Sequence, residues 1–171
     1  GEEGEAVRRM VLICSGTGCQ ASRSEAIAAN LEELVANAGM EEQVEVSITG
    51  CFGFCEQGPV VEVLPDDVFY VKVQPEDAEE IFEEHLRGDR PVNRLLYEEP
   101  VLKEKVATQH EMSFYKKQQR IALRNCGLIN PEKIEETIAN DGYQGLGRAL
   151  TELDPDGVID EMMASGLRGR G

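Results

Sequence analysis

The apolar positions of the first ninety residues follow strand-like spacing in four segments. Residues 8–14, RRMVLIC, predict a first strand that ends in a cysteine. Residues 44–49, VEVSIT, alternate strictly, which predicts a half-buried strand with its two valines and its isoleucine facing inward. The run PVVEVLPDDVFYVKV predicts two more strands, joined as a β-hairpin at 65–67. A sheet of four strands is therefore expected.

Two further segments follow helical spacing. The sequence SRSE at 22–25 has the form of a capping box and predicts the start of a helix that ends at Gly39. Its apolar residues recur on one face, as expected for a helix packed on a sheet. A second, acidic helix is expected at 75–86, closed by Gly88. The order β-α-β-β-β-α predicts an α/β protein of the thioredoxin-like sandwich type.

The pattern changes near residue 90. Residues 1–90 are expected to form the thioredoxin-like domain, and 91–127, which show no clean periodicity, are predicted to be an extended linker. Short helices are expected within 128–171, where Pro131 and Pro155 each follow a capping residue. We therefore expect the chain to continue into the start of a further domain.

Charge is distributed unevenly along the 171 residues, whose formal net charge is −16. Residues 1–90 carry 20 acidic and 6 basic side chains, a net of −14, and residues 91–171 carry 13 and 11, a net of −2. Such an acidic surface argues against nucleic acid and anionic membranes, and suits either a basic partner or solubility alone. No apolar run is long enough to insert into a membrane, and the N-terminal residues lack a signal-peptide core, so a cytoplasmic location is expected.

Four cysteines have the spacing C-x4-C-x31-C-x3-C, and each pair follows a predicted strand. Because the two strands of a β-α-β unit are parallel, both pairs are expected at the same edge of the sheet. Four thiolates suit an iron–sulfur cluster or zinc, and spacings of four and three in glycine-rich loops fit the wider footprint of a two-iron cluster. Structural zinc and a disulfide or inert thiols remain as alternatives. The members of this set are Cys14, Cys19, Cys51 and Cys55.

The other chemically active side chains are assigned to structure. Cys126 is alone and is expected to pack as a small hydrophobic residue. His85 and His110 have no partner at ligand spacing. Since no Ser-His-Asp or Cys-His arrangement is present, no catalytic residue is expected.

The stretches CSGTGC and GCFGFCEQGP resemble the thioredoxin-like [2Fe–2S] ferredoxins, which include the small iron–sulfur subunit of respiratory complex I. The resemblance covers residues 8–88. It implies that Cys14, Cys19, Cys51 and Cys55 ligate a [2Fe–2S] cluster. If it did not hold, the chain would be a zinc-bound docking domain or a thiol/disulfide redox protein.

A second resemblance begins after the predicted linker. RNCGLINPEKIEETIANDGYQGLGRAL and SGLRGRG are similar to the start of the flavoprotein subunit of complex I. This implies that 128–171 is the truncated start of an FMN- and NADH-binding domain, with Gly169, Arg170 and Gly171 in its flavin loop.

Together the two parts resemble the beta subunit of NAD(P)-linked, often electron-bifurcating, [FeFe] hydrogenases or formate dehydrogenases. The resemblance implies a flavoprotein oxidoreductase whose FMN, NAD(H) or NADP(H) and [4Fe–4S] sites belong to the parent subunit. Its partners would be other iron–sulfur subunits of a multimeric enzyme. Residues 1–171 alone are expected only to carry electrons.

Overall fold

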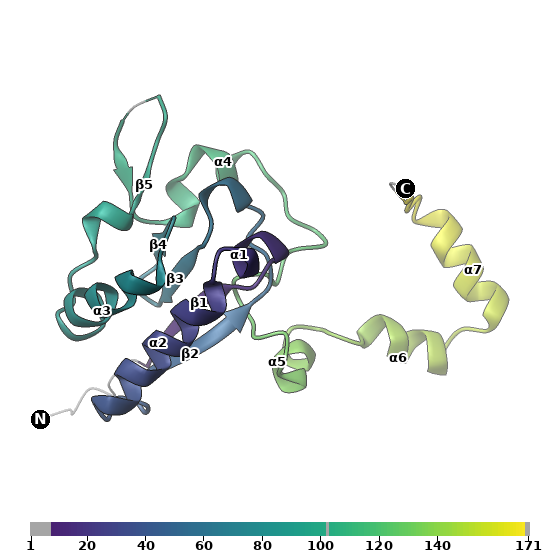
Figure 1. Ribbon diagram of the computed structural model, residues 1–171. Helices are drawn as coiled ribbons and strands as arrows, with labels where there is room; N and C mark the ends of the chain where they lie inside the picture. The colour runs from purple at the N-terminus through teal and green to yellow at the C-terminus, as the bar shows by residue number, and fades with distance from the viewer. Residues whose placement is uncertain (1–7, 102, 170–171) are drawn as a thin grey trace, which may run out of the picture. The chain divides into compact units, whose positions relative to one another are not determined.

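The computed structural model describes residues 8–101 and 103–169, which form two compact units that divide after residue 132. The first unit contains the predicted sandwich, and the second contains three short helices (Figure 1). Among the described residues, no helix is both long enough and apolar enough to cross a membrane.

A four-stranded mixed sheet forms the centre of the first unit, with the strand order β2-β1-β3-β4. β1 pairs with β2 in parallel, whereas the β1–β3 and β3–β4 pairs are antiparallel. The predicted strands and the hairpin are confirmed. Their bounds are β1 Arg9–Cys14, β2 Val44–Thr49, β3 Val61–Leu64 and β4 Val68–Tyr70.

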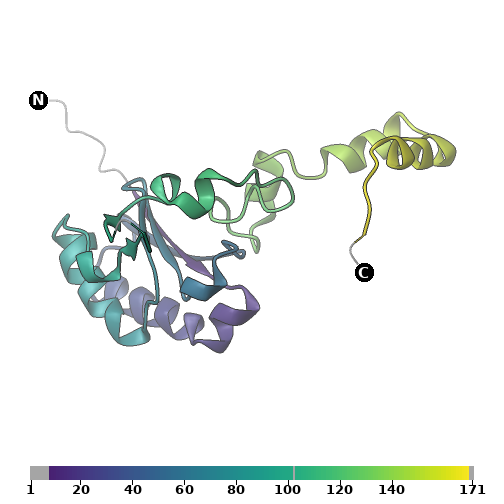
Figure 2. The same ribbon diagram turned by 90° about the horizontal axis from the view of Figure 1, so that it is seen from above.

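Helices cover one face of this sheet (Figure 2). α2, Ser24–Asn37, lies beside a second helical run made of η2 Pro75–Asp77, α3 Ala78–Glu80 and the π-helical turn η3 Ile81–Arg87. The fully buried side chains between these helices and the strands include Val11, Ile13, Ile27, Leu31, Val61, Val63 and Ile81. The apolar side chains of the strands and those of the helices thus face each other across one core, as the sequence predicts.

The start of α2 differs from the predicted capping box at 22–25. A short helix, α1 (Thr17–Ala21), occupies part of the expected glycine-rich loop, and α2 begins only at Ser24. Arg23 precedes α2 with a left-handed φ of 67°, and no side chain caps this helix. The turn between two consecutive helices has replaced the predicted cap.

Short elements between Tyr97 and Tyr115 cover the other face of the sheet. Leu12, Phe69 and Val71 point to this face and pack against Tyr97, Met112 and Tyr115. The segment predicted as an extended linker therefore contains buried side chains. Its apolar residues have irregular spacing because its elements are short: η4 Asn93–Leu95, β5 Tyr97–Glu98, β6 Lys105–Val106, η5 Gln109–Glu111 and α4 Ser113–Lys116.

The second unit consists of α5 Ile134–Ala139, α6 Gln144–Thr151 and α7 Pro155–Ala164. α7 begins as predicted, with the Asp154 Oδ1 atom accepting a hydrogen bond of 2.7 Å from the Gly157 N–H. No residue of these three helices is buried. Leu150 and Met163 are about three-quarters exposed, at 75% and 76%.

Glu62 is the least expected residue of the sheet. It lies opposite Leu12 and Phe69 on neighbouring strands and is 5% exposed. Burial, and then the nearby Asp67, raise the pKa of its carboxyl to about 7, while Arg120 opposes this shift. The folded protein therefore binds a proton at Glu62 at a pH where the unfolded chain has released it.

Replacing this carboxyl by an amide, Glu62→Gln, is expected to remove a pH dependence of stability. The contribution of Glu62 is present below a pH of about 4.5 and is lost as the pH rises through about 7. At pH 8 we expect Glu62→Gln to be more stable than the wild type by about 2–3 kcal/mol. Urea unfolding from pH 4.5 to 8 measures this, and the exposed Glu79→Gln is the control. Parallel pH profiles for the wild type and Glu62→Gln would contradict the prediction.

Candidate metal centre

The first cysteine pair is buried at the end of β1. Cys14 is the last residue of the strand and Cys19 lies in α1, and each is 2% exposed. The Cys14 N–H donates to the carbonyl of Val60 at 3.0 Å, which fixes its backbone to the neighbouring β3 segment. Burial, and then the adjacent Cys14 thiol, raise the pKa of Cys19 to about 12. A bound cation would reverse this by stabilising the thiolates.

The second pair lies in the loop that follows β2. Cys51 is half-buried, and Cys55, which begins the 3₁₀ turn η1 (Cys55–Gln57), is exposed. Their Sγ atoms are 3.9 Å apart, and the Gly53 N–H donates to the Cys51 Sγ at 3.3 Å. Tetrahedral ligation with metal–sulfur bonds of about 2.3 Å places two sulfurs about 3.8 Å apart. The second pair thus has the spacing of two ligands on one metal ion.

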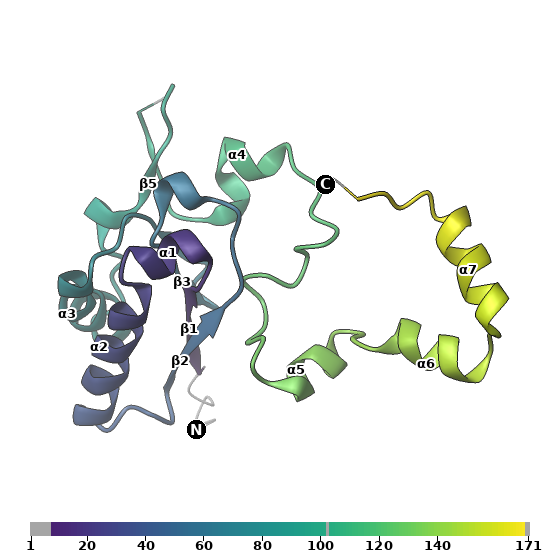
Figure 3. The same ribbon diagram turned by 45° about the vertical axis from the view of Figure 1, so that its right-hand side comes forward.

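The loops that carry the two pairs follow β1 and β2, which lie side by side and in parallel (Figure 3). β1 and β2 are parallel, as predicted, with Cys14 in register with Thr49, so both loops leave the same edge. A Cβ on Gly58, which follows the second pair, would lie 2.7 Å from the Cys19 Sγ. Only glycine permits this approach, so a side chain at residue 58 would separate the two pairs.

The donor set fits a two-iron cluster. Each pair also acts electrostatically on the other, since Cys55 contributes to the raised pKa of Cys19 and Cys14 to that of Cys55, after the larger effects within each pair. In the described part of the chain, no three His, Cys, Asp or Glu side chains are grouped closely enough to hold one metal ion. The sulfurs are arranged as two pairs, and four thiolates in two pairs suit [2Fe–2S]. The assignment of these four cysteines as ligands stays a prediction.

Phe52 and Phe54 anchor the second loop to the sheet and to α4, respectively. They are 1% and 7% exposed. The Phe52 ring meets the edge of Phe69 at 5.3 Å, and Phe54 stacks on Phe114 at 4.4 Å. Phe52 therefore fills the space between the loop and the sheet, and Phe54 packs between the loop and α4.

The structure also brings Cys126 to this region. Cys126 lies next to Gly50, at the beginning of the second cysteine loop, and is half-buried. Burial, and then the nearby Cys51, raise the pKa of its thiol. No other cysteine or histidine lies close to Cys126 in the sequence, so only the tertiary contact with Gly50 reveals that it is adjacent to the site.

The remaining candidates lie elsewhere. His85 is buried, and its Nδ1 atom lies 2.8 Å from the Tyr70 hydroxyl, which supports the structural role predicted for it. His110 lies in η5. Gly169 is exposed, and Arg170 and Gly171 lie outside the described residues, so the predicted flavin loop stays a prediction.

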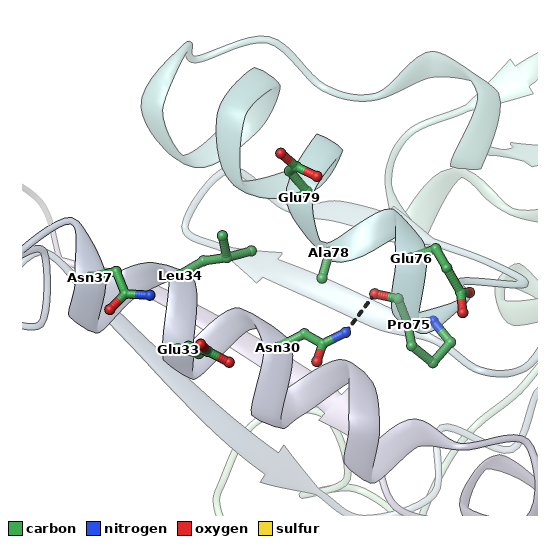
Figure 4. A pocket seen from close by; sticks show the side chains of 8 residues that line it. All are labelled: Asn30, Glu33, Leu34, Asn37, Pro75, Glu76, Ala78 and Glu79. Atoms are coloured by element: carbon green, nitrogen blue, oxygen red, sulfur yellow. Dashed lines mark hydrogen bonds between the residues drawn. The ribbon is translucent and has the colours of Figure 1, made fainter.

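A separate groove lies between α2 and the segment 75–79 (Figure 4). The Asn30 amide spans it by donating to the carbonyl of Pro75 at 2.9 Å. Glu33, Glu76 and Glu79 line it, and no cysteine does. The groove adds negative surface to the first unit and is not part of the cysteine site.

Comparison with known proteins identifies similar sequences for the first unit. Residues 4–86 match the family described as thioredoxin-like [2Fe–2S] ferredoxin. The chain is 40% identical over 81 residues to a 2Fe–2S ferredoxin of Aquifex aeolicus, an alignment that covers 47% of this chain and 73% of the relative. It is 39% identical over 77 residues to a 2Fe–2S ferredoxin of Clostridium pasteurianum, covering 45% and 76%.

A longer relative is also similar to part of the chain. The NADP-reducing hydrogenase subunit HndC of Solidesulfovibrio fructosivorans is 57% identical over 56 residues, which cover 33% of this chain and 11% of that subunit. Among solved structures, the wild-type thioredoxin-like [2Fe–2S] ferredoxin of Aquifex aeolicus aligns with a TM-score of 0.49 at 33% identity. That alignment covers 53% of this chain and 96% of the other.

Proposed function

Because this chain belongs to the thioredoxin-like [2Fe–2S] ferredoxin family, we propose that it carries single electrons through a cluster held by Cys14, Cys19, Cys51 and Cys55. The observation that carries this proposal is the convergence of the two cysteine pairs at one edge of the sheet, with the second pair 3.9 Å apart. When bound, the cluster supplies one-electron redox chemistry. The protein fixes the position of the cluster and sets its environment.

Named groups of the chain perform these tasks. The Gly53 N–H donates to the Cys51 sulfur and stabilises its negative charge. Burial of Cys14 and Cys19 excludes water from the first pair. The exposed Cys55 marks the side of the site that solvent or a redox partner can approach. The site is thus enclosed on the sheet side and open beyond Cys55.

We further propose that the parent enzyme is a multimeric NAD(P)H-linked oxidoreductase. The similarity to part of a hydrogenase subunit supports this, as does the second unit, whose Leu150, Met163 and Leu167 are about three-quarters exposed. Apolar helix faces of this kind suit packing against further polypeptide, for which we propose the flavoprotein domain. FMN, NAD(H) or NADP(H) and a [4Fe–4S] cluster would then belong to the parent subunit. The partners would be its other iron–sulfur subunits, in the cytoplasm.

Metal analysis of anaerobically purified protein tests the proposed cluster. We expect about two iron and two sulfide per chain, and an EPR signal that appears on one-electron reduction. One zinc per chain without sulfide would favour the docking domain. Reductant-sensitive alkylation of two thiols, without visible absorption, would favour a thiol/disulfide protein. Either of these results would exclude the proposed electron carrier.

A further inference from the structure

Residues 109–129, which we call the clamp segment, contact the second cysteine loop from outside the region that matches the ferredoxin family. The Tyr115 hydroxyl donates to the carbonyl of Phe52 at 3.0 Å, in the middle of the loop. At the start of the loop, the Gly127 N–H donates to the Thr49 Oγ1 at 3.1 Å. The Thr49 hydroxyl in turn donates to the carbonyl of Ile129 at 2.9 Å. The segment therefore holds the loop at two points.

Side-chain packing reinforces these hydrogen bonds. The ring of Phe54 stacks on Phe114 with an interplanar angle of 16° and meets the edge of Tyr115 at 5.6 Å. At Gly127, whose φ is +83°, a Cβ would lie 2.3 Å from the Cε1 atom of Phe52. The clamp segment and the loop are thus packed so closely that a side chain at residue 127 would displace one of them.

Arg120 contacts three other residues of the clamp segment. Its NH2 group donates to the Gln109 Oε1 at 3.0 Å, and its NH1 group donates to the carbonyl of Cys126 at 3.4 Å. Its guanidinium lies 5.4 Å from the centre of the Tyr115 ring. One side chain thereby connects the beginning, the middle and the end of the segment.

The loop itself has few restraints of its own. Residues 51–54 have no regular secondary structure, and the Gly53 N–H bond to the Cys51 sulfur depends on the loop conformation. Ordering a loop costs conformational entropy, which contacts from elsewhere in the fold must offset. Packing around a metal ligand also controls solvent access to the site.

We propose that the clamp segment holds the second cysteine loop in its ligating conformation, with Tyr115 as the positioning residue that fixes the carbonyl of Phe52. The proposal rests on the proposed function, because it assigns the role of Tyr115 toward the same cluster. It adds that a segment beyond the ferredoxin-like region controls how firmly Cys51 and Cys55 retain iron.

The test compares Tyr115→Phe with Tyr97→Phe in the full chain. Tyr97 is also buried and also meets Phe54, at 5.3 Å, but no described residue makes a hydrogen bond with its hydroxyl. In Tyr115→Phe we expect iron release to a chelator to be about fivefold faster, the factor that corresponds to one hydrogen bond. The EPR signal of the reduced protein is expected to gain a second component, because the loop then adopts more than one conformation. Tyr97→Phe should match the wild type in both measurements.

Amide hydrogen exchange in the metal-free protein separates this proposal from the proposed function. Exchange at 50–56 is expected to be about fivefold faster in Tyr115→Phe, while exchange in β1 stays unchanged. If amide exchange in the loop is unchanged, or if Tyr115→Phe and Tyr97→Phe have equal effects, the proposed role of the clamp segment is wrong. Wild-type protein that contains no iron and no sulfide would overturn the proposed electron-transfer function. The hydrogen-exchange result would still decide whether the clamp segment holds the loop.

Discussion

Replacing Cys51 by alanine is expected to abolish binding of the [2Fe–2S] cluster. The Cys51 and Cys55 sulfurs are 3.9 Å apart, so removing one leaves an iron with an incomplete ligand set. Alanine is preferred to serine because a serine oxygen can itself bind metal. We expect iron and sulfide to fall from about two per chain to near zero, together with loss of the visible absorption and of the reduced EPR signal.

Cys126→Ala is the matched control for this variant. Cys126 lies beside Gly50, close to the site, but is outside both cysteine pairs. We expect Cys126→Ala to retain the cluster with unchanged stoichiometry. Loss of the cluster in Cys126→Ala, or its retention in Cys51→Ala, would contradict the assignment of the ligands. The second outcome would point to Cys126 as a replacement ligand.

Replacing Tyr70 by phenylalanine is expected to destabilise the first unit by about 2–4 kcal/mol. The Tyr70 side chain is fully buried, and its hydroxyl accepts from the Val92 N–H at 2.9 Å and lies 2.8 Å from the His85 Nδ1. The variant removes the hydroxyl and leaves two buried polar groups without this partner. Unsatisfied buried groups cost more than the hydrogen bond itself contributes.

The geometry around His85 explains why the loss is large. The His85 Nε2 atom faces the Asp66 Oδ2, a hydrogen-bond acceptor, at 3.2 Å, so Nε2 carries the proton of the neutral ring. The Nδ1 atom then accepts from the Tyr70 hydroxyl, whose oxygen accepts from the Val92 N–H. Burial lowers the pKa of His85, which keeps the ring neutral and compatible with this chain of donors. Urea unfolding of Tyr70→Phe at pH 8 measures the cost, with Tyr97→Phe as the control. A loss below about 0.5 kcal/mol would show that water replaces the hydroxyl.

Local patterns in the sequence predicted the sheet and the grouping of the cysteines. Apolar runs and one strictly alternating segment predicted the strands, and the β-α-β order implied that β1 and β2 are parallel, which the structure confirms. Parallel strands bring their ends together, so two motifs distant in sequence were expected at one edge. These inferences succeeded because the apolar spacing of a strand and the parallel direction of the two strands in a β-α-β unit can both be read from short local segments.

The sequence by itself determined the α/β class, the order of the elements and the candidate ligands. Only the tertiary structure decided that short elements between Tyr97 and Tyr115 cover the second face of the sheet, where Glu62 of β3 is buried. It also decided that Tyr115 and Cys126 lie beside the second cysteine loop. The physical reason is that these contacts join short elements of irregular spacing to residues far away in the chain. Long-range packing of this kind leaves no period in the sequence.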